Sequence, residues 1–84
     1  MPTYLVERYL PGRDRPWLEA AVTRLRRQRR RAKHLGSTYV PADDSCFCRF
    51  EAETADFVHR AARIAQLPPG EVVQAVEMTV TSER

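Results

Sequence analysis

Two kinds of apolar spacing alternate along this chain of 84 residues, and breaks containing proline or glycine separate them. Four segments have the alternation or the β-branched and aromatic content typical of strands: residues 3–10, 35–40, 45–51 and 71–80. Two segments repeat their apolar residues at helical intervals: residues 15–33 and a segment that begins after Thr54. The order βαββαβ predicts a single ferredoxin-like α+β domain over residues 1–84, a four-stranded antiparallel sheet with two helices on one face.

Local signals set the ends of the first helix. Pro11-Gly12 ends the first strand, Asp14 is a suitable N-cap, and Pro16 is tolerated in a first helical turn. The apolar face of the helix consists of Leu18, Ala21, Val22, Leu25 and Ala32. This spacing predicts one amphipathic helix over residues 15–33.

The middle of the chain reads as a hairpin followed by the second helix. Residues 41–44, Pro-Ala-Asp-Asp, supply the turn between two strands. In the second of these strands Cys46, Cys48 and Phe50 share one face, and Phe47, Arg49 and Glu51 share the other. Thr54 is the expected N-cap of the second helix, whose apolar residues are Val58, Ala61, Ala62 and Ala65.

Two helices on one side leave the other face of the sheet open. We place apolar side chains on that face beside charged ones: Phe47, Val73 and Ala75 with Arg49 and Glu77. A partly apolar open sheet in a small domain is typical of a dimer interface or a ligand pocket. We favour a homodimer formed through this face.

A run of basic residues interrupts an otherwise acidic chain. Seven of the 14 basic residues fall between Arg24 and Lys33, and the other seven face 11 acidic residues elsewhere, although the net charge of the chain is +3. Such a run is either a binding surface for a polyanion or the solvated face of a helix. The candidate polyanion-binding residues are Arg24, Arg27, Arg30 and Arg31. No aromatic residue is interleaved with the run, so base stacking has no platform there, which favours the solvated face.

The two cysteines, Cys46 and Cys48, are too close on one strand to form an unstrained bridge. Free thiols, the lack of a signal-peptide pattern at the N-terminus and the lack of a membrane-spanning apolar run indicate a cytoplasmic protein. Buried cysteines beside Phe50 read more readily as core residues than as metal ligands. No arrangement typical of a catalytic site is recognisable, so an enzyme is the less favoured reading.

Several short motifs occur together in a distinctive order. They are Tyr4-Leu5-Val6-Glu7-Arg8 before Pro11-Gly12, Ser37-Thr38-Tyr39-Val40, Cys46-Phe47-Cys48-Arg49-Phe50-Glu51-Ala52, and Leu67-Pro68 before Glu71-Val72-Val73. Through them the chain resembles a family of small bacterial domains of unknown function that is named after a nickel-binding member. The resemblance covers nearly the whole chain apart from the arginine-rich part of the first helix. It implies a ferredoxin-like fold, a homodimer and binding of nickel or another divalent transition metal.

The resemblance also suggests which residues contribute to a metal site: Glu7, His34, Cys48 and His59. Glu7 and Cys48 stand where members of the family commonly have these residue types. Some members have histidines in the first helix and before the Tyr-Val pair of the second strand, where this chain has arginines and Ser37-Thr38. No pair of candidate ligands has a diagnostic spacing such as Cys-x-x-Cys.

Overall fold

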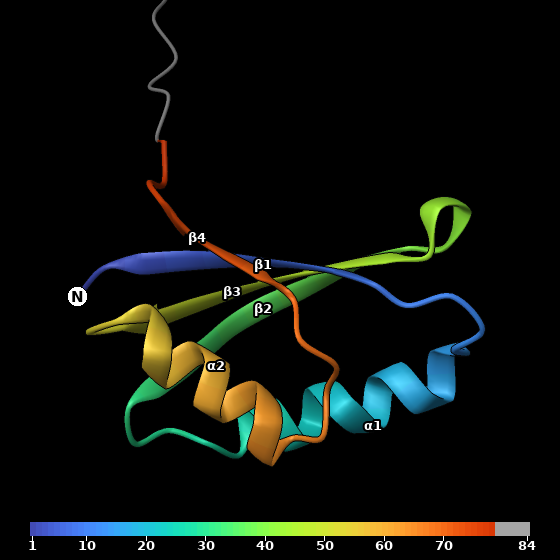
Figure 1. The fold of residues 1–84 in the computed structure, drawn as a ribbon, viewed down its shortest axis with the longest axis horizontal. Helices are drawn as coiled ribbons and strands as arrows, with labels where there is room; N and C mark the ends of the chain where they lie inside the picture. Colours follow the sequence, from blue (N-terminus) through green and yellow to red (C-terminus); the bar gives the residue numbers. More distant parts are fainter. Residues whose placement is uncertain (79–84) are drawn as a thin grey trace, which may run out of the picture.

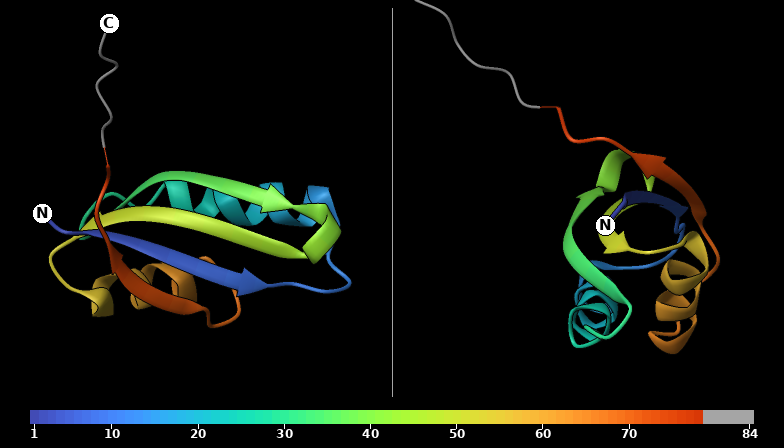
Figure 2. Two further views of the ribbon diagram at one scale, coloured as in Figure 1. Left: turned by 90° about the horizontal axis from the view of Figure 1, so that it is seen from above. Right: turned by 90° about the vertical axis from the view of Figure 1, so that its left-hand side faces the viewer.

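The computed structural model describes residues 1–78 and has the ferredoxin-like topology that the sequence predicts. Its helices and strands are β1 (Thr3–Tyr9), α1 (Arg15–Arg26), β2 (Ala32–Val40), β3 (Ser45–Ala52), α2 (Ala55–Ile64) and β4 (Glu71–Ala75). The strands form one antiparallel sheet in the order β2-β3-β1-β4. Both helices cover the same face of this sheet (Figures 1 and 2), which leaves the other face without a covering layer in the described chain.

The core lies between the sheet and the two helices. Alternate residues of β1 and β3 point toward the helices, and Val6, Cys48 and Phe50 are almost completely buried there. Leu25 of α1 and Val58 of α2 are fully buried against them. The predicted division of β3 into two faces is therefore confirmed, with Cys46, Cys48 and Phe50 on the helix side.

Helix α1 ends at Arg26, so the predicted helix over residues 15–33 is wrong in its last part. No apolar residue follows Leu25 until Ala32, so the intervening turns would have had nothing to bury and would have placed arginines next to each other at helical spacing. Ala32 is buried in β2 instead, which is longer at its start than the predicted strand over residues 35–40. His34, which directly follows the predicted helix over residues 15–33, lies within β2.

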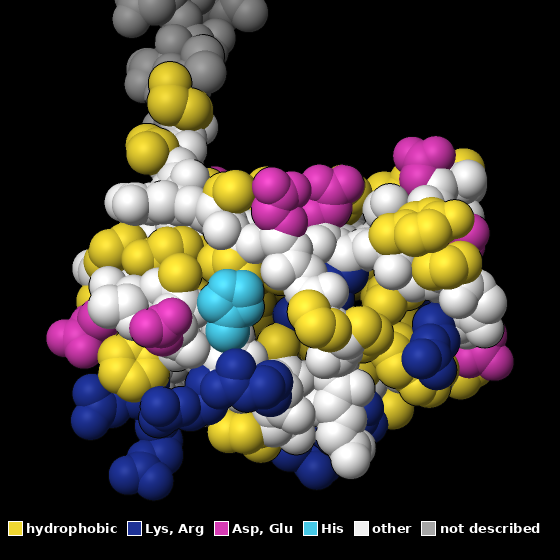
Figure 3. Space-filling view, viewed as in Figure 1, with side chains coloured by type: hydrophobic (Ala, Val, Ile, Leu, Met, Phe, Trp, Pro, Cys, Tyr) yellow, Lys and Arg dark blue, Asp and Glu magenta, His cyan; other side chains and the backbone are white. Residues whose placement is uncertain are grey.

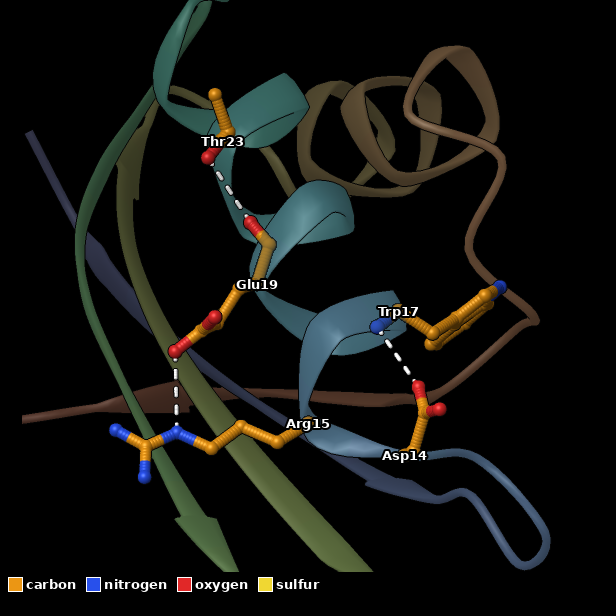
Figure 4. A network of polar contacts seen from close by, with 5 residues as sticks. All are labelled: Asp14, Arg15, Trp17, Glu19 and Thr23. Atoms are coloured by element: carbon orange, nitrogen blue, oxygen red, sulfur yellow. Dashed lines mark hydrogen bonds and ion pairs between the residues drawn. The ribbon is translucent and has the colours of Figure 1, made fainter.

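Both predicted N-cap residues occupy the N-cap position, but only one of them makes a capping hydrogen bond. The Asp14 carboxylate accepts a hydrogen bond of 2.9 Å from the backbone N–H of Trp17, which confirms the predicted N-cap of α1 (Figure 4). An ion pair of 3.0 Å between Arg15 and Glu19 joins successive turns of the same helix. Thr54 occupies the N-cap position of α2, but its side chain makes no capping hydrogen bond.

The hairpin between β2 and β3 contains the predicted turn and one irregularity. The turn is the short 3₁₀ segment Pro41–Asp43, followed by Asp44 in a left-handed conformation with φ of 51°. The pairing of β2 with β3 shifts register between His34 and Gly36. Because of this bulge, Ser37 lies opposite Cys48 and shares its face of the sheet.

Strand β4 is shorter than the predicted segment 71–80. Its pairing with β1 ends where Thr3 lies opposite Ala75, and Pro2, the residue before Thr3, has no N–H with which to continue the ladder. Val73 and Ala75 are on the open face, as predicted, because their partners Leu5 and Thr3 are there. Glu77 follows the strand, and residues 79 and 80 lie outside the described residues.

Candidate functional site

A groove rich in arginine lies between the α1–β2 connection and helix α2. Its cavity has a volume of about 510 Å³. Five arginines line it: Arg27, Arg29, Arg30 and Arg31 from the connection and Arg60 from α2. We call it the arginine groove. In Figure 3 the lysine and arginine side chains gather at the lower left, over the α1–β2 connection of Figure 1.

The walls of the arginine groove also include apolar side chains from α2. These are Phe57, Ala61 and Ile64. The guanidinium carbon of Arg31 lies 5.2 Å from the centroid of the Phe57 ring, and that of Arg60 lies 5.8 Å from it. The structure thus supplies an aromatic side chain that the arginine run itself lacks, because α2 packs beside the connection that carries the run.

Two hydrogen bonds attach this part of the chain to α2. The Arg24 Nε donates to the carbonyl oxygen of Ala65 at 2.8 Å, and the Gln28 Nε2 donates to that of Ala61 at 3.0 Å. Arg24 is therefore engaged in holding α1 to the end of α2 and does not line the groove. Of the four predicted polyanion-binding residues, Arg27, Arg30 and Arg31 line it.

No acidic side chain lines the arginine groove in the described part of the chain. Arg31 makes one ion pair, 3.8 Å from Glu53, in which the side chains are 66% and 64% exposed. An exposed pair at this distance contributes little and leaves the guanidinium available to another anion. Five clustered cations with so little compensation produce a positive local potential.

A second polar cluster lies on the helix-facing side of the sheet and contains both cysteines, which are buried and free. Ser37 Oγ donates a hydrogen bond of 2.9 Å to Cys48 Sγ, and the sulfur atoms of Cys46 and Cys48 are 4.0 Å apart. His34 Nε2 is 2.8 Å from Ser37 Oγ. Since the serine hydrogen is directed to sulfur, the histidine nitrogen is the donor in that contact. A cavity of about 330 Å³ between α1 and β2 reaches this cluster at Ser37 and Cys46.

Arg8 is the charged member of the thiol cluster and is only 3% exposed. Its Nε donates to the carbonyl oxygen of Pro68 at 2.8 Å, while Nη1 has no hydrogen-bond partner among residues 1–78. Residues 1–78 contain two ion pairs, Arg15 with Glu19 and Arg31 with Glu53, and Arg8 takes part in neither. Burial lowers the pKa of Arg8, and the charges of Cys48 and Cys46 act in the opposite direction. The cysteines are therefore the groups that can balance this buried cation.

The pKa values of the two thiols shift in opposite directions. The hydrogen bond from Cys46 is the largest influence that lowers the pKa of Cys48, aided by hydrogen bonding with His34 and Ser37 and by the charge of Arg8. The same hydrogen bond to Cys48, together with burial, raises the pKa of Cys46. Cys48 is thus the more acidic thiol of the pair and Cys46 the less acidic one. The spacing of the cysteines gives no sign of this difference, which depends on side chains from β1 and β2.

The residues suggested by the family resemblance do not all come together. Cys48 and His34 belong to the thiol cluster and are connected through Ser37. Glu7 is exposed and lies on the opposite face of the sheet, because it alternates with Val6 and Arg8 along β1. His59 is half-buried on α2. Within residues 1–78, no three His, Cys, Asp or Glu side chains are grouped so that they could hold a metal ion.

Comparison with known proteins gives no matching family model, no matching curated protein and no matching solved structure. Across residues 1–78, neither helix is long and apolar enough to cross a membrane. The arginine groove is the site whose chemistry is best defined by the geometry.

Proposed function

We propose that this chain is a non-enzymatic interaction module that binds a polyanion in the arginine groove. The observation that carries the proposal is the convergence of five arginines on one cavity of about 510 Å³ with no acidic side chain in its lining among the described residues. Arginine forms paired hydrogen bonds with phosphate, sulfate and carboxylate oxygens. The sequence placed the candidate binding residues on one face of a helix. The proposed binding site is instead a groove between the α1–β2 connection and α2.

Binding of this kind releases counterions and is weakened by salt. A direct test is fluorescence anisotropy of labelled heparin fragments titrated with the protein at two salt concentrations. We expect measurable binding at low salt and a loss of at least about tenfold at the higher concentration. Binding that does not respond to salt, or no binding at low salt, would reject the proposal.

Helix α2 offers a matched pair of variants for the same assay. Arg60 lines the arginine groove, whereas Arg63 lies one turn later on the same helix and does not line it. Arg60→Gln and Arg63→Gln remove one charge each from exposed helical positions. We expect the first to weaken heparin binding severalfold more than the second. Equal effects would mean that net charge alone, and not the groove, is responsible.

We also infer that two copies of the chain associate through the open face of the sheet. Support comes from the apolar side chains on that face, where Leu5 lies opposite Val73 and Val73 is 46% exposed. Sedimentation velocity of the wild type and of Val73→Arg tests the inference. A dimer that dissociates in the variant is the expected result, and a monomeric wild type at high concentration would refute it.

Nickel binding, which the family resemblance implies, is a second proposal for the thiol cluster. It is supported by the hydrogen-bonded chain that brings Cys48 and His34 together, since thiolate and imidazole are both ligands of divalent transition metals. Calorimetric titration of the untagged protein with nickel should give heat that Cys48→Ser removes and Glu7→Gln retains. The absence of heat at micromolar nickel would end this proposal.

A further inference from the structure

The arginine groove has a feature that attraction of a bare polyanion does not require. Its α2 wall includes apolar residues, and Ile64 in that wall is 63% exposed. Phe57 lies in the same wall and is half-buried. A ligand with charged oxygens alone would contact the arginines and leave this apolar surface in water. The complementary ligand therefore has a flat apolar part beside its anionic groups.

The contacts of Phe57 also organise the cations. Arg31 and Arg60 come from different elements, yet both guanidinium groups lie within 6 Å of the centroid of its ring. A guanidinium group that stacks on a ring still presents its N–H edge to solvent, where it can form a bidentate contact with phosphate. The aromatic ring thus holds two phosphate-binding groups next to an apolar surface.

The size of the cavity limits what can enter it. A volume of about 510 Å³ falls within the range of sites that enclose one small-molecule-sized unit, roughly 300–1,000 Å³. A double helix keeps its bases stacked inside and presents only phosphates and groove edges, so its bases cannot reach Phe57. Inorganic polyphosphate has no apolar part. A single strand has both exposed bases and regularly spaced phosphates.

We propose that the ligand of the arginine groove is single-stranded nucleic acid, with phosphates bound by Arg31 and Arg60 and an unpaired base against Phe57 and Ile64. This inference rests on the proposed polyanion binding and adds the class of polyanion. Phe57 is the stacking residue, and Ile64 extends the apolar surface on which the base lies.

The test compares three labelled or competing probes at one salt concentration: a single-stranded oligonucleotide, a blunt duplex of the same sequence and inorganic polyphosphate. We expect the affinity for the single strand to be at least about fivefold higher than for the other two probes, when probes with the same number of phosphate charges are compared. Equal or tighter binding of the duplex or of polyphosphate would overturn this inference and leave polyanion binding intact. Failure of all three probes to bind would overturn both.

Two variants identify the stacking surface. Phe57→Leu keeps an apolar side chain but removes the ring, and Ile64→Ser changes a side chain that is already exposed. We expect each variant to lose at least about fivefold more affinity for the single strand than for polyphosphate. The Ile64 variant and the comparison of probes on the wild type remain informative if Phe57→Leu proves unstable. Parallel losses for the single strand and polyphosphate in both variants would reject base stacking.

Discussion

The hydroxyl of Ser37 donates a hydrogen bond of 2.9 Å to the sulfur of Cys48, from the neighbouring strand of the sheet. The contact exists because the bulge between His34 and Gly36 shifts the face on which Ser37 lies. It completes a chain of polar groups that includes His34, both thiols and, from β1, the buried Arg8. The lowered pKa of Cys48 predicts that the stability of the domain depends on pH through this cluster.

The ionisation of Cys48 predicts how stability changes with pH. Its pKa is lowered in the folded protein, chiefly by the hydrogen bond from Cys46, relative to about 8.5 for an unfolded cysteine. At pH values between the folded and the unfolded pKa of Cys48, the unfolded chain binds one more proton than the folded chain. The free energy of unfolding should therefore rise with pH by about 1.4 kcal/mol per pH unit. This stabilisation is complete above the unfolded pKa and is lost as pH falls through the folded one.

The measurement is urea unfolding at several pH values from mildly acidic to about 8, for the wild type and Cys48→Ser. The slope that disappears in the variant is the contribution of this thiol. The same slope in both proteins would show that Cys48 is protonated in the folded state.

Arg8 should be essential for stability although it lies outside the arginine groove. Arg8→Met keeps much of the buried volume but removes the hydrogen bond to Pro68 and the cation beside the thiols. Breaking a buried charged pair typically costs about 3–5 kcal/mol, and protonation of Cys48 should limit the loss to about 2–3 kcal/mol. Chemical denaturation measures it, with the exposed Arg63→Gln as control. A loss below about 1 kcal/mol would mean that Arg8 is not the counter-ion of the thiolate.

Gly70 should tolerate no side chain. A Cβ atom there would lie 2.8 Å from the carbonyl oxygen of Glu7 and 2.6 Å from Cγ of the buried Arg8. We expect Gly70→Ala to destabilise the fold by about 1–3 kcal/mol, because the β1 backbone must move. Gly12→Ala is the contrasting variant: it has open space around the new atom, and its cost is about 1–2 kcal/mol from the positive φ of 78°. Thermal unfolding at several pH values distinguishes the two variants. Only Gly70→Ala displaces Arg8 beside the thiols, so only this variant should also change how the free energy of unfolding depends on pH.

The two helix N-termini should respond differently to loss of the cap residue. Asp14→Ala removes the hydrogen bond to Trp17 and should cost about 1 kcal/mol. Thr54→Ala should cost only a few tenths of a kcal/mol, because the Thr54 side chain makes no capping bond. Denaturant unfolding of both variants provides the comparison. A larger loss of unfolding free energy for Thr54→Ala than for Asp14→Ala would contradict the capping contacts described above.

Much of the fold is present in the sequence because strands and helices leave local patterns. The alternation in residues 45–51 predicts which side of β3 meets the helices, and Pro41 to Asp44 predict the hairpin turn. The predicted end of α1 lies too far along the chain, because Ala32 fits a helical interval equally well but is buried in β2. Local spacing cannot distinguish these outcomes when both bury the same residue.

The order of the elements, the buried faces of the two helices and of β3, and the concentration of arginines between residues 24 and 33 follow from the amino-acid sequence. What those arginines contact depends on how the helices and strands pack against one another. Packing of α2 beside the α1–β2 connection places Phe57 within 5.2 Å of Arg31, and the bulge in β2 places Ser37 against Cys48. Arg31 and Phe57 lie in segments whose packing leaves no local pattern, and the bulge shifts the pairing within a hairpin that was itself predictable. Periodicity within a segment carries no information about either.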